Sequence, residues 1–310
     1  MVGRVRTGYR KLIVRKRGQS LLFFSASLLI CGLFTVLGIR FLINGNGEDS
    51  SLAGKAWNAG DYQTAYSLAL KNLEKKPLSS FWLMMSGMSS FQLAGAQINA
   101  QDAIKYIDTS IASLRKALMV GAGPSSEARA KYLLGKAYFR KGPQYADIAV
   151  DFLEQSITES YTATDLYEHL GLAYASLKDY KRSVVAFTQA LGSNPSDLLL
   201  LAIARSYLEL GEQIQARAYL IRCTEISKDT SISVQARLLL GLSLQQEGDV
   251  PGAEREYLAA LQMDNSVAEI YNALGDLYTD KGDTVKARAE WRKALRIDPT
   301  NEVSRSRLGL

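Results

Sequence analysis

Apolar residues recur along residues 53–301 at the three- and four-residue spacing that is typical of amphipathic helices. Within the predicted helices, the pair Leu240-Gly241 returns as Leu274-Gly275, 34 residues later. A repeat of this length with two helices predicts a solenoid, in which each helical hairpin buries its apolar face against the next. A solenoid offers an extended binding surface rather than an enclosed reaction centre.

The last repeat unit carries the fullest version of the pattern, with small residues where two helices approach and large residues between hairpins. Its members are Tyr271, Leu274, Gly275, Tyr278, Ala287, Trp291, Ala294 and Pro299. Earlier segments repeat parts of this pattern, which resembles that of tetratricopeptide repeats. The resemblance implies an all-α fold, a right-handed α-solenoid of about seven such helical hairpins over residues 53–301.

Glycines and prolines mark where these helices should end. Gly248 and Gly282 each stand between an expected first and second helix, where a glycine in the left-handed conformation ends a helix readily. Pro77, Pro195 and Pro299 should end second helices, because proline cannot continue a helix.

The N-terminal segment has a different pattern, since residues 20–39 contain no charged side chain and are rich in Leu, Ile, Phe and Ala. As a helix they would span about 30 Å, the hydrocarbon thickness of a bilayer. Seven basic residues precede this run and only Arg40 follows it closely, which favours a cytoplasmic N-terminus. We therefore predict a basic cytoplasmic tail over 1–19, a transmembrane helix over 20–43 in contact with the lipid bilayer, and a polar, flexible linker over 44–52.

Three other interpretations of this apolar run are open: a cleaved signal peptide, a lipoprotein site at Cys31 and a buried core helix. A signal peptide has an apolar core of about 7–15 residues and a small-residue cleavage site. This run is longer, and the sequence Asn-Gly-Asn-Gly that follows it is a poor cleavage site. Ile30 is bulky where a lipoprotein site needs a small residue, and the basic flank disfavours a core helix.

Charge is distributed unevenly along the chain. Residues 1–43 hold eight basic and no acidic residues, which leaves 29 basic and 31 acidic residues for the remainder. Nucleic-acid binding needs a basic face on the folded part, so we expect no nucleic-acid partner. The two cysteines, Cys31 and Cys223, form neither a disulfide framework nor a metal-binding motif.

We find no catalytic, cofactor-binding or metal-binding motif, and we expect the protein not to be an enzyme and to need no cofactor. His169 is the only histidine and has no neighbouring nucleophile or metal ligand in the sequence. The carboxylates near the turns are better explained as helix caps and solvated faces.

The family resemblance also implies which residues face a partner, because the first helix of each tetratricopeptide repeat lines an inner groove. The positions carried over are Arg129, Tyr132, Lys136, Phe139, Arg140, Leu172, Leu201, Arg205, Leu238, Leu242, Asn272 and Asp276. They predict a groove that changes from basic and aromatic, through apolar, to acidic, which suits an extended segment or a helix of a protein partner. Tyr132 and Lys136 do not match the Lys and Asn clamp of chaperone-binding members, which disfavours a chaperone-adaptor role.

After Pro299 only a short C-terminal cap over 302–310 remains. A helix over 302–308 has about two turns and would cover the last hairpin poorly, so we expect this end to dock on a partner or on another copy.

These features favour a membrane-anchored scaffold or adaptor that binds proteins and organises a multiprotein envelope complex, of secretion, pilus, flagellar-motor or cytochrome-maturation type. We expect a single-pass protein of a bacterial inner membrane, with its repeats in the periplasm. Two alternatives are a receptor for protein segments in an organellar or endoplasmic-reticulum membrane, and a regulatory subunit of an enzyme complex.

Overall fold

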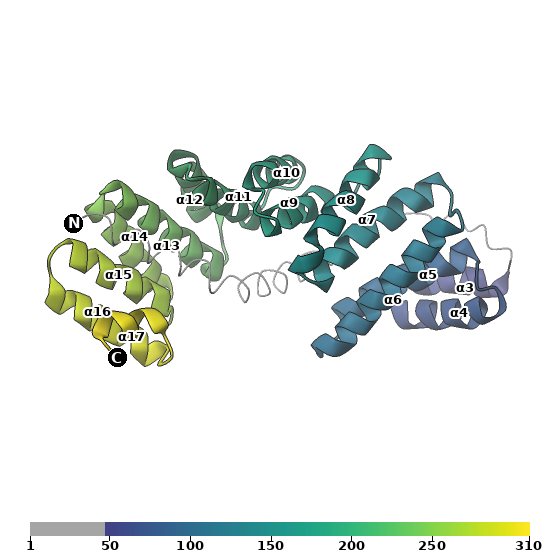
Figure 1. The fold of residues 1–310 in the computed structure, drawn as a ribbon, viewed down its shortest axis with the longest axis horizontal. Helices are drawn as coiled ribbons and strands as arrows, with labels where there is room; N and C mark the ends of the chain where they lie inside the picture. Colours follow the sequence, from purple (N-terminus) through teal and green to yellow (C-terminus); the bar gives the residue numbers. More distant parts are fainter. Residues whose placement is uncertain (1–46) are drawn as a thin grey trace. The chain divides into compact units, whose positions relative to one another are not determined.

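The computed structural model describes residues 47–310, and this part of the chain contains fifteen α-helices, one short 3₁₀ helix and no strand (Figure 1). The first helices are α3 (Glu48–Asn58), α4 (Tyr62–Lys75), α5 (Ser80–Gly95), α6 (Ala100–Met119), α7 (Pro124–Lys141), η1 (Pro143–Tyr145), α8 (Ala146–Thr158) and α9 (Leu166–Ser176). They are followed by α10 (Tyr180–Ser193), α11 (Asp197–Leu210), α12 (Gln213–Ile226), α13 (Thr230–Glu247), α14 (Val250–Met263), α15 (Ala268–Asp280), α16 (Thr284–Ile297) and α17 (Glu302–Leu308).

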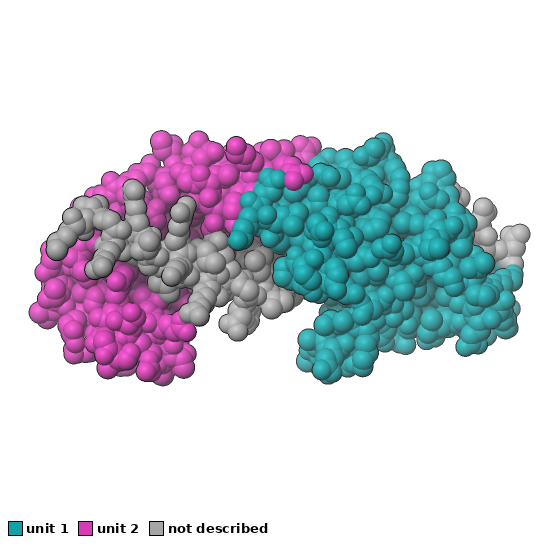
Figure 2. Space-filling model, in the orientation of Figure 1, with its two compact units in different colours: residues 1–179 teal, residues 180–310 magenta. Residues whose placement is uncertain are grey.

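The chain divides into two compact units, which Figure 2 shows in different colours. Unit 1 extends to Asp179 and contains α3 to α9, and unit 2 extends from Tyr180 to Leu310 and contains α10 to α17. The boundary falls between the two helices of one predicted hairpin, α9 and α10. Each unit is therefore described by itself.

Consecutive helices pack as hairpins inside each unit. In unit 1 the pairs are α3 with α4, α5 with α6, and α7 with α8, and in unit 2 they are α11 with α12, α13 with α14, and α15 with α16. First helices of neighbouring hairpins also touch, α5 with α7 and α11 with α13. The expected all-helical solenoid of paired helices is confirmed, and its right-handed sense stays a prediction.

Glycines at the predicted positions allow the two helices of a hairpin to approach closely. A Cβ atom at Gly135 would lie 2.5 Å from Cγ of Leu153, well inside van der Waals contact. A side chain at Gly275 would likewise collide with the indole of Trp291, which is buried on α16. The recurring Leu-Gly pair thus marks the places where a large residue of the second helix fills the space beside the first.

The predicted helix ends are also present. Gly248 and Gly282 have φ angles of +87° and +76°, the left-handed conformation that glycine adopts without strain. The next residue in each turn is an aspartate that caps the following helix; Asp283, for example, accepts a hydrogen bond of 3.0 Å from the Lys286 amide. The three predicted helix-ending prolines lie two residues beyond the ends of α4, α10 and α16, at Pro77, Pro195 and Pro299.

The core of unit 2 includes the only cysteine among the described residues. Cys223 on α12 is fully buried, and its thiol donates a 3.4 Å hydrogen bond to the backbone carbonyl of Asp197. Burial raises the pKa of this thiol to about 11, with a smaller contribution from the charge of Asp197.

The structure differs from the predicted linker over 44–52, because α3 begins at Glu48. Residues 48–52 are helical, and Asp49 accepts hydrogen bonds from Lys71 at 3.3 Å and Asn72 at 3.1 Å on α4. Polar side chains that resemble a linker in the sequence therefore hold the first helix to the second. The predicted tail over 1–19 and transmembrane helix over 20–43 lie outside the described residues, and none of the described helices has both the length and the apolar character needed to cross a bilayer.

Candidate partner-binding site

Four of the predicted residues of unit 1 lie on one side of α7. Arg129, Tyr132, Lys136 and Arg140 are spaced by three or four residues, and such residues share one face of a helix. This face lies toward α5 and α9, the helices on either side of α7 in the row of first helices. The spacing therefore brings together side chains from three consecutive hairpins.

Lys136 and Tyr132 bind Asp165, the residue that precedes α9. The Lys136 ammonium lies 2.6 Å from one carboxylate oxygen of Asp165, and the Tyr132 hydroxyl donates to the other at 2.5 Å. Lys136 also donates to the Tyr132 hydroxyl at 3.0 Å. Only 14% of the Lys136 side chain is exposed, so the contact is a largely buried ion pair that joins two neighbouring repeats.

The electrostatics of this cluster follow from burial and from Lys136. Burial alone would raise the pKa of Asp165, but His169, Lys136 and the hydrogen bonds from Lys136 and Tyr132 lower it well below its ordinary value. Asp165 is therefore ionised at neutral pH, and Lys136 is already neutralised within the protein. Lys136 and the buried Tyr132, which we expected to face a partner, instead link α7 to the start of α9.

Two further titratable groups follow Asp165 on α9. Burial and the Asp165 charge raise the pKa of Glu168 to about 7, against the opposing charge of Lys136. Burial and Lys136 lower the pKa of His169 to about 4, so its ring is neutral at physiological pH. Nδ1 of this ring donates a 2.9 Å hydrogen bond to the Asp165 carbonyl, which fixes the tautomer.

Arg140 has a different environment. Its guanidinium lies 5.0 Å from the ring centroid of Phe91 on α5 and donates a 3.3 Å hydrogen bond to the Phe91 carbonyl. The side chain is half-buried, and no carboxylate among the described residues pairs with it. Arg140 is thus a partly desolvated, fixed cation whose charge the described part of the protein leaves uncompensated.

Aromatic groups surround this part of the face. Phe139 is half-buried, with its ring 6.4 Å from and edge-on to that of His169. Tyr161, in the loop before α9, lies 5.1 Å from the Tyr132 ring and is hydrogen-bonded to Arg129. This part of the face is basic and aromatic because of Arg140 and Phe139. Lys136 adds no net positive charge, because Asp165 pairs with it.

In unit 2, the predicted groove residues differ in exposure. Leu201 is fully buried, which contradicts its expected place in an open groove. It belongs to the run Leu198–Leu201, whose uniform hydrophobicity hides which leucine faces inward. Arg205 is half-buried and donates a 2.8 Å hydrogen bond to Gln235 on α13. Leu238 and Leu242 pack against the core that α13, α14 and α15 form together. Leu172 of unit 1 is half-buried on α9.

Asn272 and Asp276 were expected at an open acidic end, and the structure contradicts this. Both are buried on α15, with relative exposures of 7% and 6%. Asn272 donates to the Asn301 side chain at 3.0 Å and accepts from the Ser304 hydroxyl, while Arg307 approaches the Asp276 carboxylate at 3.0 Å and 3.2 Å. The expected poor covering by residues 302–308 is therefore wrong at these positions, because α17 supplies the polar partners that a further repeat would bring.

Phe91 is the member of the site that the groove positions omit, whereas the family resemblance also implies a groove position for Asp165, which pairs with Lys136 instead. Phe91 fits the apolar pattern of α5, and a core role is the ordinary interpretation of such a position. Asp165 occupies the residue before a helix, where capping is the ordinary role of an aspartate. The spacing of about 30 residues between Lys136 and Asp165 is the available signal, since equivalent positions of adjacent repeats lie side by side.

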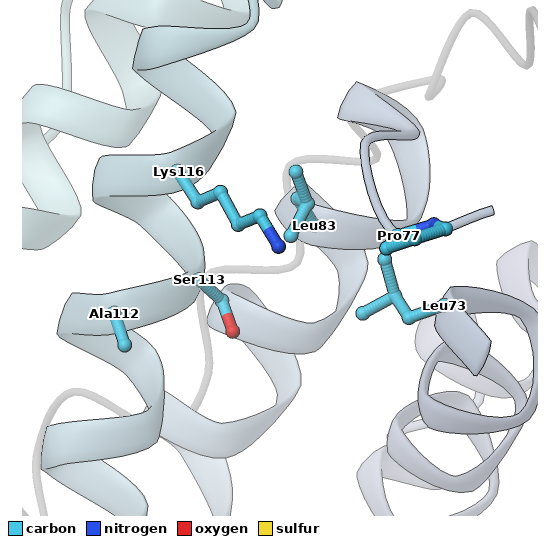
Figure 3. Close-up of a pocket in the computed structure, with 6 residues that line it drawn as sticks. All are labelled: Leu73, Pro77, Leu83, Ala112, Ser113 and Lys116. Atoms are coloured by element: carbon cyan, nitrogen blue, oxygen red, sulfur yellow. The ribbon is translucent and has the colours of Figure 1, made fainter.

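Two open depressions lie elsewhere on unit 1. One, of about 280 Å³, is bordered by helices α4, α5 and α6, and Figure 3 shows the six side chains that line it. Its lining residues are Leu73, Pro77, Leu83, Ala112, Ser113 and Lys116. The other, of about 600 Å³, lies beside the loops that precede α7 and follow α8, and includes Tyr161. Neither contains a predicted groove residue, and no set of three potential metal ligands gathers within residues 47–310.

Comparison with protein-family models decides the nature of the repeats. Tetratricopeptide-repeat models match residues 164–197, 199–230 and 238–302. These segments are tetratricopeptide repeats. They cover the pair α9 and α10, nearly all of α11 and α12, and the stretch from the middle of α13 to the end of α16. The tetratricopeptide repeats predicted from the Leu-Gly pattern are confirmed in these segments. Tetratricopeptide repeats are typically non-catalytic scaffolds for protein interactions.

Solved structures extend this assignment of fold beyond the matched segments. The C-terminal part of a tetratricopeptide repeat-containing protein from Cytophaga hutchinsonii is similar over 84% of this chain and 99% of its own, with a TM-score of 0.62 and 17% identity. MamA from Desulfovibrio magneticus is similar over 57% of this chain and 97% of its own, with a TM-score of 0.50 and 18% identity. At these identities the likeness concerns the fold alone.

One curated relative matches by sequence. The BBSome complex member BBS4 homolog of Drosophila melanogaster is 24% identical over 159 residues, which are 51% of this chain and 32% of that protein. The match thus spans about a third of the relative's length.

Proposed function

We propose that this protein is a membrane-anchored scaffold whose unit 1 binds an extended protein segment by a carboxylate at Arg140 and an apolar side chain at Phe91 and Phe139. The repeats support protein binding in general, and the environment of Arg140 supports an anionic ligand. An uncompensated, partly desolvated guanidinium gains most from a charge-assisted, bidentate contact with a carboxylate.

Arg140 is the observation on which this proposal depends. Phe91 holds the guanidinium by a cation–π contact and by its carbonyl, so little side-chain freedom is lost on binding. Lys136 cannot take the same role, because Asp165 already pairs with it. One fixed cation beside aromatic surface suits a segment with a single acidic residue, or a chain terminus, next to an apolar residue.

We further propose that residues 20–43 anchor the chain in a bacterial inner membrane and that the repeats lie in the periplasm, where the bound segment belongs to an envelope complex. The support is the uncharged run over 20–39 and the seven basic residues before it. Single cysteines placed in the N-terminal tail and in the repeats, for instance Thr7→Cys and Thr158→Cys with Cys31 replaced by serine, test the orientation. Labelling of the second but not the first by an impermeant maleimide on intact spheroplasts is expected, and the opposite pattern would exclude this topology.

The binding site is tested with peptides. A phage-displayed library of random peptides is selected on the full chain in detergent, and the enriched peptides are synthesised with a fluorophore. We expect them to share an acidic group beside an aromatic or aliphatic residue. Arg140→Glu should weaken their binding by about tenfold or more, as measured by fluorescence anisotropy.

The control has the same charge change at an exposed arginine in the other unit, Arg222→Glu on α12, and should bind the peptides as the wild type does. Arg140→Gln, which removes the charge without adding a negative one, should give an intermediate loss. Selection that yields no common acidic feature, or peptides whose affinity is the same for Arg140→Glu and wild type, would place the binding surface elsewhere.

A further inference from the structure

The smaller depression of unit 1 combines apolar walls with one cation. Leu73 at the end of α4 and Pro77 in the turn that follows border it together with Leu83 of α5, which is 3% exposed. Ser113 and Lys116 of α6 line it from the other side, and Figure 3 shows the Lys116 side chain extending from α6 toward Leu83. We call this depression the α6 pocket. Its volume of about 280 Å³ suits one residue of a ligand rather than a whole helix, which is about 10 Å across.

Lys116 gives the α6 pocket an uncompensated positive charge. It is the only charged side chain among the six that line the pocket, it is exposed, and no carboxylate in the described part of the chain pairs with it. The other cations of α6 are occupied, since Lys105 pairs with Asp102 and Arg115 donates a 2.8 Å hydrogen bond to Tyr138. An anion in the pocket would therefore meet Lys116 without displacing an internal partner.

Ser113 can add a hydrogen bond from the same face of α6. It stands three residues before Lys116, and residues at this spacing lie side by side on a helix. Its hydroxyl is 3.1 Å from that of Ser86 on α5, and either group can be the donor. When Ser86 donates, the hydrogen of the Ser113 hydroxyl is free for a ligand. A carboxylate, which has two acceptor oxygens, matches an ammonium and a hydroxyl on one helix face.

The apolar walls indicate which kind of carboxylate fits. Successive side chains of an extended segment point to opposite sides, so an internal acidic residue and the apolar residue next to it do not enter one small pocket together. At the C-terminus of a chain, the carboxylate and the side chain are attached to the same Cα atom. A C-terminal residue can therefore fill the pocket with both groups at once.

We propose that the α6 pocket binds the C-terminal residue of a protein partner. Its carboxylate contacts Lys116 and Ser113, and its aliphatic side chain lies against Leu73, Pro77 and Leu83. The two donors belong to α6, a second helix, whereas the groove implied by the family resemblance is lined by first helices. The α6 pocket is thus a site in addition to the one proposed at Arg140.

Peptides with defined ends test the proposal on the full chain in detergent. The probe is the peptide Gly-Ser-Gly-Ser-Leu with a free carboxylate, titrated to about 5 mM against the fluorescently labelled chain and followed by thermophoresis. We expect saturable binding that weakens by about tenfold or more when the C-terminus is amidated, because the charge is lost. Serine in place of the terminal leucine should also weaken it. A peptide with a photoreactive diazirine in the terminal leucine should crosslink within residues 73–83 or 112–116.

Variants of Lys116 test the charged half of the site. Lys116→Glu should weaken binding of the free-acid peptide by about tenfold or more, Lys116→Met should give an intermediate loss, and Lys116→Arg should retain binding. The charge-matched control is Lys181→Glu, which changes an exposed lysine on α10 in the other unit and should bind as the wild type does. Arg140→Glu should also bind this peptide normally, which separates the α6 pocket from the site proposed above.

Absence of saturable binding, equal affinity for the acid and the amide, or equal affinity of Lys116→Glu and wild type would overturn the proposal. Crosslinks confined to other helices would do the same. An amidated peptide with an internal aspartate, such as Gly-Asp-Ser-Leu-Gly, is the remaining comparison. If it binds as tightly as the free acid and is weakened by Lys116→Glu, the ligand is an acidic side chain and the C-terminal assignment is wrong.

Discussion

The α7 region of unit 1 and the α15 region of unit 2 use the same two repeat positions in opposite ways. Tyr132 and Lys136 stand three residues before and one residue after Gly135, and Asn272 and Asp276 stand in the same places around Gly275. In unit 1 the helix supplies the cation and the next repeat supplies Asp165. In unit 2 the helix supplies the anion and α17 supplies Arg307.

Helix α13 shows a third solution at these positions. Leu238 and Leu242 occupy them and pack against the core instead of forming an ion pair. The comparison teaches that these two positions join a hairpin to the element that follows it, by apolar contact or by an ion pair of either sense. They are therefore poor guides to where a ligand binds, and Arg140, one turn further along α7, is the better candidate.

The largest effect on stability is expected when the two polar residues at these positions of α15 are replaced by the leucines that α13 has there. Asn272→Leu/Asp276→Leu would leave the buried Ser304 hydroxyl without its acceptor and Arg307 without its carboxylate. We expect unit 2 to lose about 3 kcal/mol of stability. Hydrogen exchange should show that the amides of α17 lose protection, whereas Arg305→Ala, a change of an exposed arginine on the same helix, should leave them protected. Unchanged protection in the double variant would mean that apolar contacts alone hold α17.

A smaller loss of stability is expected in unit 1 from Asp165→Leu, which leaves the mostly buried Lys136 without its carboxylate partner. We expect about 2 kcal/mol, below the cost for a fully buried pair because 34% of the Asp165 side chain is exposed. Adding Lys136→Met should recover most of the loss, and hydrogen exchange of α7 and α9 measures both. A double variant as unstable as Asp165→Leu alone would show that the two residues do not act as a pair.

The smallest effect on stability concerns its dependence on pH. Because the pKa of Glu168 is raised to about 7, folded protein binds more protons at this site than unfolded protein between about pH 4.5 and pH 7, so its contribution to stability falls as the pH rises. Glu168→Gln should therefore stabilise unit 1 by about 1 kcal/mol at pH 8, discounted for partial exposure, and should make little difference at pH 4.5.

His169 opposes this effect in part of the same range. Its pKa is lowered from 6.5 to about 4, so its contribution to stability rises with pH over that interval. Thermal unfolding of His169→Gln should show stability that declines steadily between about pH 4.5 and pH 7. In the wild type this decline should be smaller, because His169 has the opposite effect on stability in part of that range. Equal benefit from Glu168→Gln at pH 4.5 and pH 8 would contradict the assigned titration.

Helix pairing was predictable because each element carries its own local signal. Gly248 and Gly282 end helices as glycines commonly do, Pro195 and Pro299 follow helix ends, and the Leu-Gly pairs mark close approach. The division between α9 and α10 was not predictable, since the hairpin from Tyr167 to Ala190 has as complete a pattern as its neighbours. The early start of α3 was missed because Glu48 and Asp49 are equally common in linkers and in first turns of helices.

Predicting the site was harder because family positions identify a face of a helix but not what covers it. Phe139 and Arg140 are half-buried, whereas the predicted groove residues Tyr132, Leu201, Asn272 and Asp276 are buried. For Asn272 and Asp276, the deciding residues are Ser304 and Arg307, about 30 positions away in a segment outside the repeat pattern. Such contacts between consecutive elements depend on three-dimensional register, which the sequence of a single repeat does not contain.

The buried thiol of Cys223 provides a way to time the opening of unit 2. Its high pKa and complete burial suppress alkylation in the folded state, and Cys31, the only other cysteine, precedes the repeats. A pulse of an alkylating reagent would therefore add mass to the repeat region only when local unfolding separates α12 from the helices packed against it and exposes the thiol. The rate of that mass gain, followed by mass spectrometry, would report how often the native molecule exposes this helix.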